Sequence, residues 1–342
     1  LSMRFGRLFV APMSRYGSRT TAAAGHTLSA AGFLLLACGQ VVPALAWVGV
    51  VVFGVGYGAV VLGIKVYLVG RAEDARERLG ALAWLAVALN LGAALGPIAA
   101  GLLLAGPGPT GALLLAAVGA LLSAALTLRM PSTRVDATDR FRWSALRRAT
   151  EPDIAVSLVS LVIAFAMYAQ LASVLPLHVE SSIGVAWVGL VFAGNAILVV
   201  AAQLPITRLS RRFPWVDRYS GPIGTVLFAT GFAALAASTH VATLVICVVM
   251  VSLAECLVLP FVERDLADRL STAGLAAAFT LSAAAMGVGE TLGSVVGVRA
   301  TLSSSAAFTH LMTSLAVIGA VASLLLTVVI RYRINHREGT AP

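Results

Sequence analysis

Residues 44–69 read ALAWVGVVVFGVGYGAVVLGIKVYLV. This stretch is apolar throughout except for one charged residue, Lys65. An α-helix needs roughly 20 apolar residues to cross the ~30 Å hydrocarbon core of a bilayer, so this stretch is long enough to span it. Its apolar residues are continuous and do not alternate with polar ones, which excludes the strands of a transmembrane β-barrel. The stretch therefore predicts a membrane-spanning helix.

The rest of the chain has the same character. Of its 342 residues, 59% are hydrophobic and 11% are charged, whereas soluble domains have roughly 25% charged residues. The sequence therefore predicts an all-α membrane protein. Ten full transmembrane helices are expected at residues 22–39, 44–69, 79–104, 110–130, 154–178, 185–205, 219–237, 241–261, 275–298 and 309–330.

The net charge of +9 would suggest a nucleic-acid partner in a soluble protein. Here, however, 20 of the 24 Lys and Arg residues fall in alternate loops, which share one side of the membrane if every segment crosses once. The positive-inside rule makes that side cytoplasmic. We therefore expect a multi-pass protein of the cell membrane whose partner is the lipid bilayer and not nucleic acid, with the loop at 131–153 and the tail at 331–342 in the cytoplasm.

The sequence has few features of an enzyme. Cys38, Cys247 and Cys256 all lie in apolar segments without CxxC spacing, which supports neither a disulfide framework nor a metal site. There is no HExxH sequence, no Asp-rich metal motif and no phosphate-binding loop of the type that drives ATPases. We expect no metal, no cofactor and no enzymatic activity.

The N-terminal segment is short for a membrane span. Arg15 belongs to the cytoplasmic side but follows only 14 residues, which reach ~21 Å as a helix. The first residue is Leu and no signal peptide is recognisable. We expect that sequence upstream of residue 1 is missing.

An internal repeat relates the two halves of the chain. Residues 11–19, APMSRYGSR, resemble residues 204–212, LPITRLSRR, and residues 91–97, LGAALGP, resemble residues 288–294, VGETLGS, at nearly the same offset. Many secondary transporters are built from such repeats. The expected organisation is an N-terminal bundle at 1–130, a linker at 131–153, a C-terminal six-helix bundle at 154–330 and a tail at 331–342.

These repeated segments resemble motifs of the major facilitator superfamily, especially of its twelve-helix drug/proton antiporter-like exporters. The family's loop motif between its second and third helices is similar to residues 10–19, and its fifth-helix antiporter motif is similar to residues 92–101. Ser14 stands where the family has Asp. The residues assigned to conformational motifs, together with their counterparts in the second half, are Ser14, Arg15, Gly17, Arg19, Gly92, Gly96, Pro97, Thr207, Arg208, Arg212, Gly289 and Gly293.

The resemblance implies a two-bundle helical transporter that lacks its first helix and part of the second. The implied function is proton-coupled export of a small organic molecule by alternating access, with the substrate and protons as partners. A solute uptake porter of the same superfamily and a degenerate or sensory relative stay open as alternatives. We expect a monomer.

Acidic side chains inside predicted spans are candidates for the proton site. Glu255 lies about eight residues, or ~12 Å, before the cluster Glu263-Arg264-Asp265 and hence near the middle of the membrane. A carboxyl group there favours its neutral form and can load and release a proton. Glu290 lies on a glycine-rich face and is a second proton site or the partner of a basic group. For Glu255 the alternative is a neutral carboxyl group that is hydrogen-bonded and serves packing.

Other polar residues of the spans are candidates for the substrate cavity. Polar groups that face hydrocarbon are costly, so these residues should face protein or water. Tyr168 and Gln170 are two residues apart and should point in different directions. Lys65 is also close enough to the membrane surface to snorkel, and the Asn residues can equally bond between helices. The candidates are Arg4, Arg7, Lys65, Asn90, Tyr168, Gln170 and Asn195.

Glycines of the repeat also predict packing. Gly92, Gly96 and Gly293 occupy equivalent places in the two halves, and glycine lets helix backbones approach closely. We expect these three residues to mark close contacts between helices of opposite halves.

Overall fold

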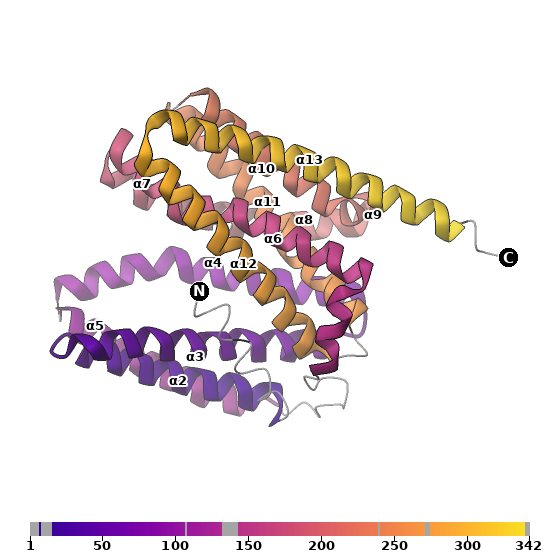
Figure 1. Ribbon diagram of the computed structural model, residues 1–342. Helices are drawn as coiled ribbons and strands as arrows, with labels where there is room; N and C mark the ends of the chain where they lie inside the picture. Colours follow the sequence, from indigo (N-terminus) through magenta and orange to yellow (C-terminus); the bar gives the residue numbers. More distant parts are fainter. Residues whose placement is uncertain are drawn as a thin grey trace. The chain divides into compact units, whose positions relative to one another are not determined.

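The computed structural model describes residue 7 and residues 16–106, 108–131, 143–238, 240–270 and 274–338, and these form helices joined by short loops (Figure 1). Ten helical spans within this part of the chain are long and apolar enough to cross a membrane, which confirms the expected number. The long helices are α2 (Ser18–Cys38), α3 (Pro43–Gly70), α4 (Ala75–Ala105), α5 (Gly108–Arg129), α6 (Pro152–Ser173), α8 (Val185–Arg212), α10 (Ser220–Ala237), α11 (Val241–Arg269), α12 (Leu275–Ser303) and α13 (Ser305–Glu338).

Several helices continue beyond the apolar windows. α8 is seven residues longer at its C-terminal end than the window at 185–205, and α11 is eight residues longer than the window at 241–261. Hydropathy detects the lipid-embedded part of a helix, whereas backbone hydrogen bonding continues beyond it. The expected span at 154–178 divides into α6 and the short helix α7 (Leu175–Ser182), because Pro176 cannot donate the backbone hydrogen bond that an uninterrupted helix needs.

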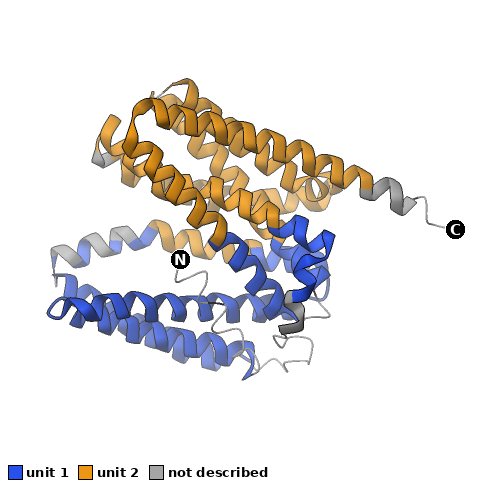
Figure 2. Ribbon diagram, in the orientation of Figure 1, with its two compact units in different colours: residues 1–82, 95–158, 263–287 blue, residues 83–94, 159–262, 288–342 orange. Residues whose placement is uncertain are grey.

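The chain divides into two compact units (Figure 2). Unit 1 comprises residues 1–82, 95–158 and 263–287, and unit 2 comprises residues 83–94, 159–262 and 288–342. Each unit contains residues from both predicted halves. The division of the chain at the linker stays a prediction.

In unit 1, α2 packs closely against α3 through glycines that recur every seven residues on both helices. A methyl group at Gly25 would lie 2.6 Å from the backbone nitrogen of Val60, and one at Gly56 would lie 2.6 Å from that of Ser29. Real side chains do not approach so closely, so only glycine fits at these points. The six glycines are Gly25 and Gly32 on α2, Gly39 directly after α2, and Gly49, Gly56 and Gly63 on α3.

The apolar core of unit 1 joins α3 to the end of α11 and the start of α12. Leu62 and Val66 of α3 and Phe279 of α12 are buried in it. Dispersion contacts of this kind are individually weak and collectively large. They hold the end of α11 and the start of α12 within unit 1.

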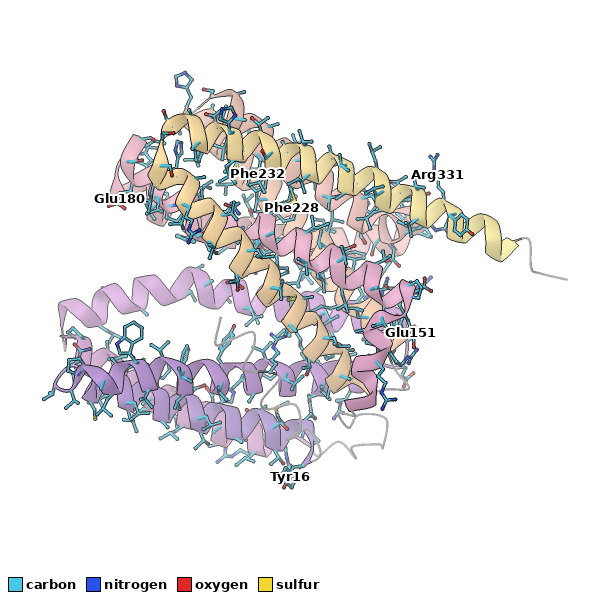
Figure 3. The ribbon with its side chains drawn as sticks, viewed as in Figure 1. Tyr16, Glu151, Glu180, Phe228, Phe232 and Arg331 are labelled. Carbon is cyan, nitrogen blue, oxygen red and sulfur yellow. The ribbon has the colours of Figure 1, made fainter. Side chains whose placement is uncertain are left out.

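The larger core belongs to unit 2. Phe228 and Phe232 of α10, labelled in Figure 3, are each 1% exposed and stack with ring centroids 6.4 Å apart. The hydroxyl of Ser323 on α13 donates to the carbonyl oxygen of Pro222 on α10 at 2.9 Å, which ties these two helices together. The helices of this core position the candidate site.

The expected glycine contacts are partly wrong. Among the described residues, a methyl group at Gly92 or Gly96 would meet no atom within 4 Å. Gly293 does mark a close contact, but with the backbone of Ala166 on α6, which lies in the same half. Glycine permits close approach without imposing it. Gly289, Gly293 and Gly297 of α12 lie against residues of α6 that have the same four-residue spacing, whereas Gly92 and Gly96 of α4 meet no such neighbours among the described residues.

The linker contains a short 3₁₀ helix, η2 (Trp143–Thr150). Arg148 donates two hydrogen bonds to the carboxylate of Glu151, at 2.8 and 3.2 Å. These bonds lower the pKa of Glu151, because they favour its charged form.

Candidate functional site

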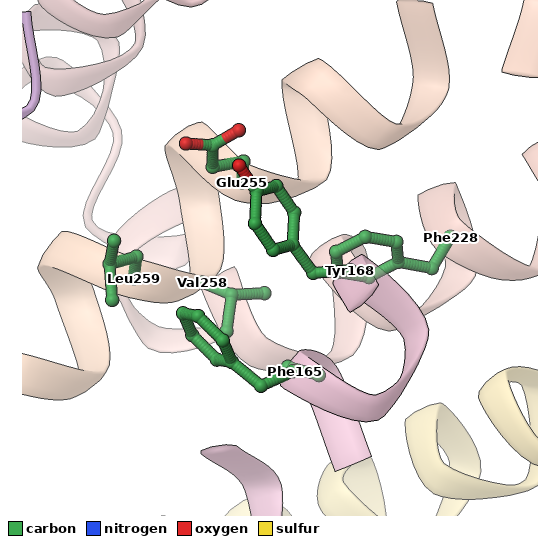
Figure 4. Close-up of a pocket in the computed structure, with 7 residues that line it drawn as sticks. Phe165, Tyr168, Phe228, Glu255, Val258 and Leu259 are labelled. Atoms are coloured by element: carbon green, nitrogen blue, oxygen red, sulfur yellow. The ribbon is translucent and has the colours of Figure 1, made fainter. Parts of the chain in front are cut away.

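A pocket in unit 2 brings a carboxylate together with aromatic rings (Figure 4). Glu255 enters from α11, Phe165 and Tyr168 from α6, and Phe228 from α10. The lining is completed by Ala164, Val258 and Leu259. The site therefore combines an apolar wall with one charged group.

Glu255 is held by a polar contact between α11 and α8. The amide nitrogen of Asn195 on α8 donates to the hydroxyl oxygen of Ser252 at 2.9 Å and lies 3.4 Å from a carboxylate oxygen of Glu255. Ser252 and Glu255 are three residues apart and therefore share a helix face. Of the two readings for Asn195, the bond between helices is the one observed. It also orients the proton-site candidate.

Tyr168 and Gln170 point in different directions, as expected. Tyr168 lines the pocket and extends toward Glu255 (Figure 4). Gln170 is buried against α12, where its amide nitrogen donates to the carbonyl oxygens of Ala166 at 2.7 Å and Gly293 at 3.1 Å. Tyr168 is thus the residue of this pair that lines the pocket, and Gln170 joins two helices.

Pro260 interrupts α11 between the pocket and the end of the helix. Proline has no backbone N–H, so the carbonyl oxygen four residues earlier, that of Cys256, loses its usual partner. The side-chain amide of Gln203 on α8 donates to this oxygen at 3.2 Å, and both groups are buried. Gln203 was not among the candidate site residues. A Pro inside an apolar window is the signal that a buried donor is needed nearby.

Eight residues beyond Glu255, Glu263 of α11 forms a buried ion pair with Lys65 of α3. The side chain of Glu263 is 2% exposed and that of Lys65 is 6% exposed. The hydroxyl of Ser282 on α12 also donates to Glu263, at 3.3 Å. α11 continues as a helix through the cluster Glu263-Arg264-Asp265 and turns Glu263 toward α3. Lys65 neither snorkels nor lines the pocket of unit 2.

Further ion pairs of unit 1 surround the end of α11. Arg78 of α4 lies 2.6 Å from Asp268, and Arg269 lies 2.7 Å from Asp265 and 3.4 Å from Asp153 of α6. Partly exposed pairs contribute little individually. As a network they fix the last turns of α11 against α4 and α6.

The remaining candidates lie outside the pocket of unit 2. Asn90 donates to the carbonyl oxygen of Ala86 on its own helix at 3.1 Å. Glu290 is half-buried on α12. Arg7 is buried in unit 1, and its guanidinium lies 3.5 Å from the carbonyl oxygen of Phe279. Arg4, the remaining cavity candidate, lies outside the described residues.

Two residues of the first loop motif have clear local roles. Gly17 has a φ of 98° and precedes α2, a conformation that favours glycine. Arg19 donates to the carbonyl oxygen of Met130 at 3.0 Å, which satisfies a backbone acceptor just after α5. Ser14 and Arg15 lie outside the described residues, as does the side chain of Pro97.

The copy of this motif in the second half lies at the end of α8. The hydroxyl of Thr207 donates to the carbonyl oxygen of Gln203 at 2.9 Å within the helix, and Arg208 is exposed. Arg212 is exposed too, with its guanidinium carbon 5.5 Å from the centroid of the Phe213 ring.

The family model described as Major Facilitator Superfamily matches residues 1–220. No match is found among curated proteins.

Solved structures with the same fold are transporters of low sequence identity. The human organic anion transporter TETRAN matches with a TM-score of 0.73 and 17% identity, covering 95% of this chain and 81% of its own. The fucose:proton symporter of E. coli matches with a TM-score of 0.71 and 14% identity, covering 97% and 89%. A POT family transporter in complex with 5-aminolevulinic acid matches with a TM-score of 0.68 and 14% identity, covering 96% and 85%. The expected all-α transporter fold is confirmed.

Proposed function

The chain belongs to the Major Facilitator Superfamily, and on this premise we propose that it is a secondary active transporter that exports a small organic molecule in exchange for protons by alternating access. It does so as a multi-pass protein of the cell membrane, with the linker and the C-terminal tail in the cytoplasm. The observation that carries the proposal is the position of Glu255 in the pocket of unit 2.

Glu255 is the group that carries the proton. Glu255 lines the pocket together with Phe165, Tyr168 and Phe228, and its carboxylate lies 3.4 Å from the amide nitrogen of Asn195. A neutral carboxylic acid tolerates an apolar surrounding far better than a carboxylate does, so a change in hydration of the pocket shifts its proton affinity. Proton binding thereby favours the conformation in which the pocket is drier.

α11 connects this site to the ion pairs of unit 1. Glu255 and Glu263 lie on one helix with Pro260 between them. A coupled cycle requires two states whose contacts differ. Loss of the contacts of Glu263 with Lys65 and Ser282 would release the end of α11 from α3 and α12, which gives the helix two arrangements that protonation can bias.

Export is favoured over uptake by the resemblance of residues 92–101 to the antiporter motif. The direction of transport is tested in cells. Export lowers the accumulation of a substrate in the cell, and a proton ionophore restores this accumulation. A solute uptake porter would give the opposite result. A sensory or degenerate relative would move no substrate.

The coupling is tested with the full-length protein in liposomes that carry an imposed proton gradient. Ethidium, chloramphenicol and fluorescein serve as cationic, neutral and anionic probes. We expect at least one probe to be concentrated, and an ionophore to abolish this. Glu255→Gln, which mimics the protonated state, should still exchange the probe passively but fail to concentrate it.

Two further variants complete this test. Glu180→Gln removes an exposed carboxylate of α7 outside the pocket and should leave transport unchanged. Glu290→Gln should impair transport less than Glu255→Gln. Gradient-driven transport by Glu255→Gln at the rate of the unmodified protein would eliminate the role of Glu255.

A further inference from the structure

The end of α8 and the short helix α9 (Pro214–Arg218) form a strongly basic segment of unit 2 (Figure 1). Phe213 has an extended backbone, with φ −125° and ψ 93°, as expected for a residue before proline. α8 therefore ends at this point and the chain turns into α9. Residues 208–218, which we call the basic corner, contain four arginines and one aspartate.

The arginines of the basic corner differ in their surroundings from those at the end of α11. Arg269 lies 2.7 Å from the carboxylate of Asp265. In contrast, Arg208, Arg212 and Arg218 are exposed and form no ion pair with another described residue. Arg208 and Arg212 are four residues apart on α8 and share a face, where like charges repel each other. An anion bound at this face would relieve the repulsion.

Large apolar side chains are exposed between these arginines. Leu209 is 46% exposed, Phe213 40% and Trp215 56%. Trp is enriched where a membrane meets water, because its ring prefers the level of the lipid headgroups. The basic corner therefore has the mixture of cations and aromatic surface that matches this level of a bilayer.

The anion that these side chains match best is a phosphate group. A guanidinium group presents its N–H donors in a planar fork that fits two phosphate oxygens. In the orientation proposed above, α8 ends on the cytoplasmic side, and the cytoplasmic leaflet is the one that carries anionic lipids. Charge and position thus point to the same class of molecule.

We propose that the basic corner is a binding site for an anionic phospholipid, with the lipid phosphate on Arg208, Arg212 and Arg218 and the upper part of the acyl chains against Phe213 and Trp215. The residues that line the pocket of unit 2 take no part in this site. The inference goes beyond the proposed function and does not depend on the transported substrate or on proton coupling.

The lipid class is tested by native mass spectrometry of the purified full-length protein in detergent. The probes are phosphatidylglycerol and phosphatidylcholine with identical acyl chains, which both contain a phosphate but have net charges of about −1 and 0. We expect phosphatidylglycerol to bind at least about tenfold more tightly, which is ~1.4 kcal/mol. Glycerol 3-phosphate, which has the phosphate without acyl chains, should not displace the lipid at the same concentration.

Substitutions then assign the binding to the basic corner. Replacement of Arg208, Arg212 and Arg218 by Gln should lower the affinity for phosphatidylglycerol about fivefold for each arginine, which is ~1 kcal/mol each. The affinity for phosphatidylcholine should change far less, and this binding also shows that the variant is folded. Trp215→Ala should weaken the binding of both lipids severalfold, because it removes aromatic surface and no charge.

A second triple variant is the matched control for net charge. It replaces three exposed arginines of other helices by Gln and should leave the affinity for phosphatidylglycerol nearly unchanged. These arginines are Arg129, Arg147 and Arg299.

Three results would overturn the inference. Equal affinities for the two lipids would show that the charge of the headgroup is not recognised. Equal losses in the two triple variants would show that binding follows the net charge of the protein and not the basic corner. Displacement of phosphatidylglycerol by an equal concentration of glycerol 3-phosphate would show that the site takes a soluble phosphate compound and not a lipid.

Discussion

Lys65 on α3 and Glu263 on α11 are 198 residues apart in sequence and form an ion pair that is almost completely buried. Burial removes both charges from water, and the loss of hydration offsets much of their attraction. Phe279, whose ring centroid lies 5.7 Å from the Lys65 ammonium, and Ser282 provide further contacts for the pair. Such a pair contributes little net stability. Removal of either partner is nevertheless destabilising, because the other charge stays buried.

The first prediction concerns the removal of one partner. Glu263→Gln leaves the Lys65 ammonium buried without its carboxylate, which should cost ~3–5 kcal/mol. Lys65→Met combined with Glu263→Leu removes both charges and should restore most of this loss, because Ser282 keeps its bond to the carbonyl oxygen of Phe279 at 3.1 Å. Thermal unfolding of the purified variants in detergent measures the difference.

Arg148→Met is the control, because it breaks a pair on the surface and should change the unfolding midpoint little. A double variant as unstable as Glu263→Gln would contradict this account of the pair.

The second prediction concerns the packing of α2 on α3. Gly56→Ala introduces a methyl group 2.6 Å from the backbone nitrogen of Ser29, and overpacking of this kind costs ~1–3 kcal/mol. Gly119→Ala on α5 makes the same change where no described atom lies within 4 Å. It should be neutral or stabilising, because Ala favours helices over Gly by about 1 kcal/mol. Equal unfolding midpoints of the two variants would reject the close-packing argument.

The sequence was sufficient for the number of helices, because each apolar run is long and its hydropathy is unambiguous. It was less informative about packing. The seven-residue spacing of glycines on α2 and α3 is visible in the sequence, yet Gly92 and Gly96 look equally suited to close contact and have none among the described residues. Which face of a helix meets a neighbour depends on both helices.

The residues of the candidate site, too, could be recognised only in part from the sequence. Glu255 and Tyr168 were recognisable as polar groups in apolar spans, and the structure brings them to one pocket. Their aromatic neighbours were not recognisable, because Phe165 and Phe228 look like ordinary core residues in the sequence. The pairing of Lys65 with Glu263 was missed because the apolar window at 241–261 ends before the helix does.

The third prediction is the membrane orientation, which rests on the segregation of arginines between alternate loops. In a background with Cys38, Cys247 and Cys256 replaced, a cysteine at exposed Thr150 should react with an impermeant maleimide only after the cells are opened. A cysteine at exposed Ser304, between α12 and α13, should react in intact cells. Labelling of position 150 from outside would show that the assigned orientation is wrong.

The fourth prediction tests how Gln203 compensates for Pro260. Gln203→Leu leaves the buried carbonyl oxygen of Cys256 without the donor that it has at 3.2 Å, and an unsatisfied buried acceptor costs ~1–3 kcal/mol. Pro260→Ala supplies a backbone N–H four residues later, so α11 can satisfy this oxygen itself. The double variant should therefore be more stable than Gln203→Leu alone.

The helix and the side chain compete for one acceptor, so the two substitutions should not be additive. A double-mutant cycle on thermal unfolding measures the coupling. Thr207→Val removes a hydroxyl that is bonded within α8, and this control should be additive with Pro260→Ala.

The same variants can also be compared in transport. If the proline lets the two parts of α11 move separately, Pro260→Ala should slow gradient-driven transport while passive exchange of the probe is retained. Additive effects on stability, with transport unchanged, would show that Pro260 and Gln203 act independently.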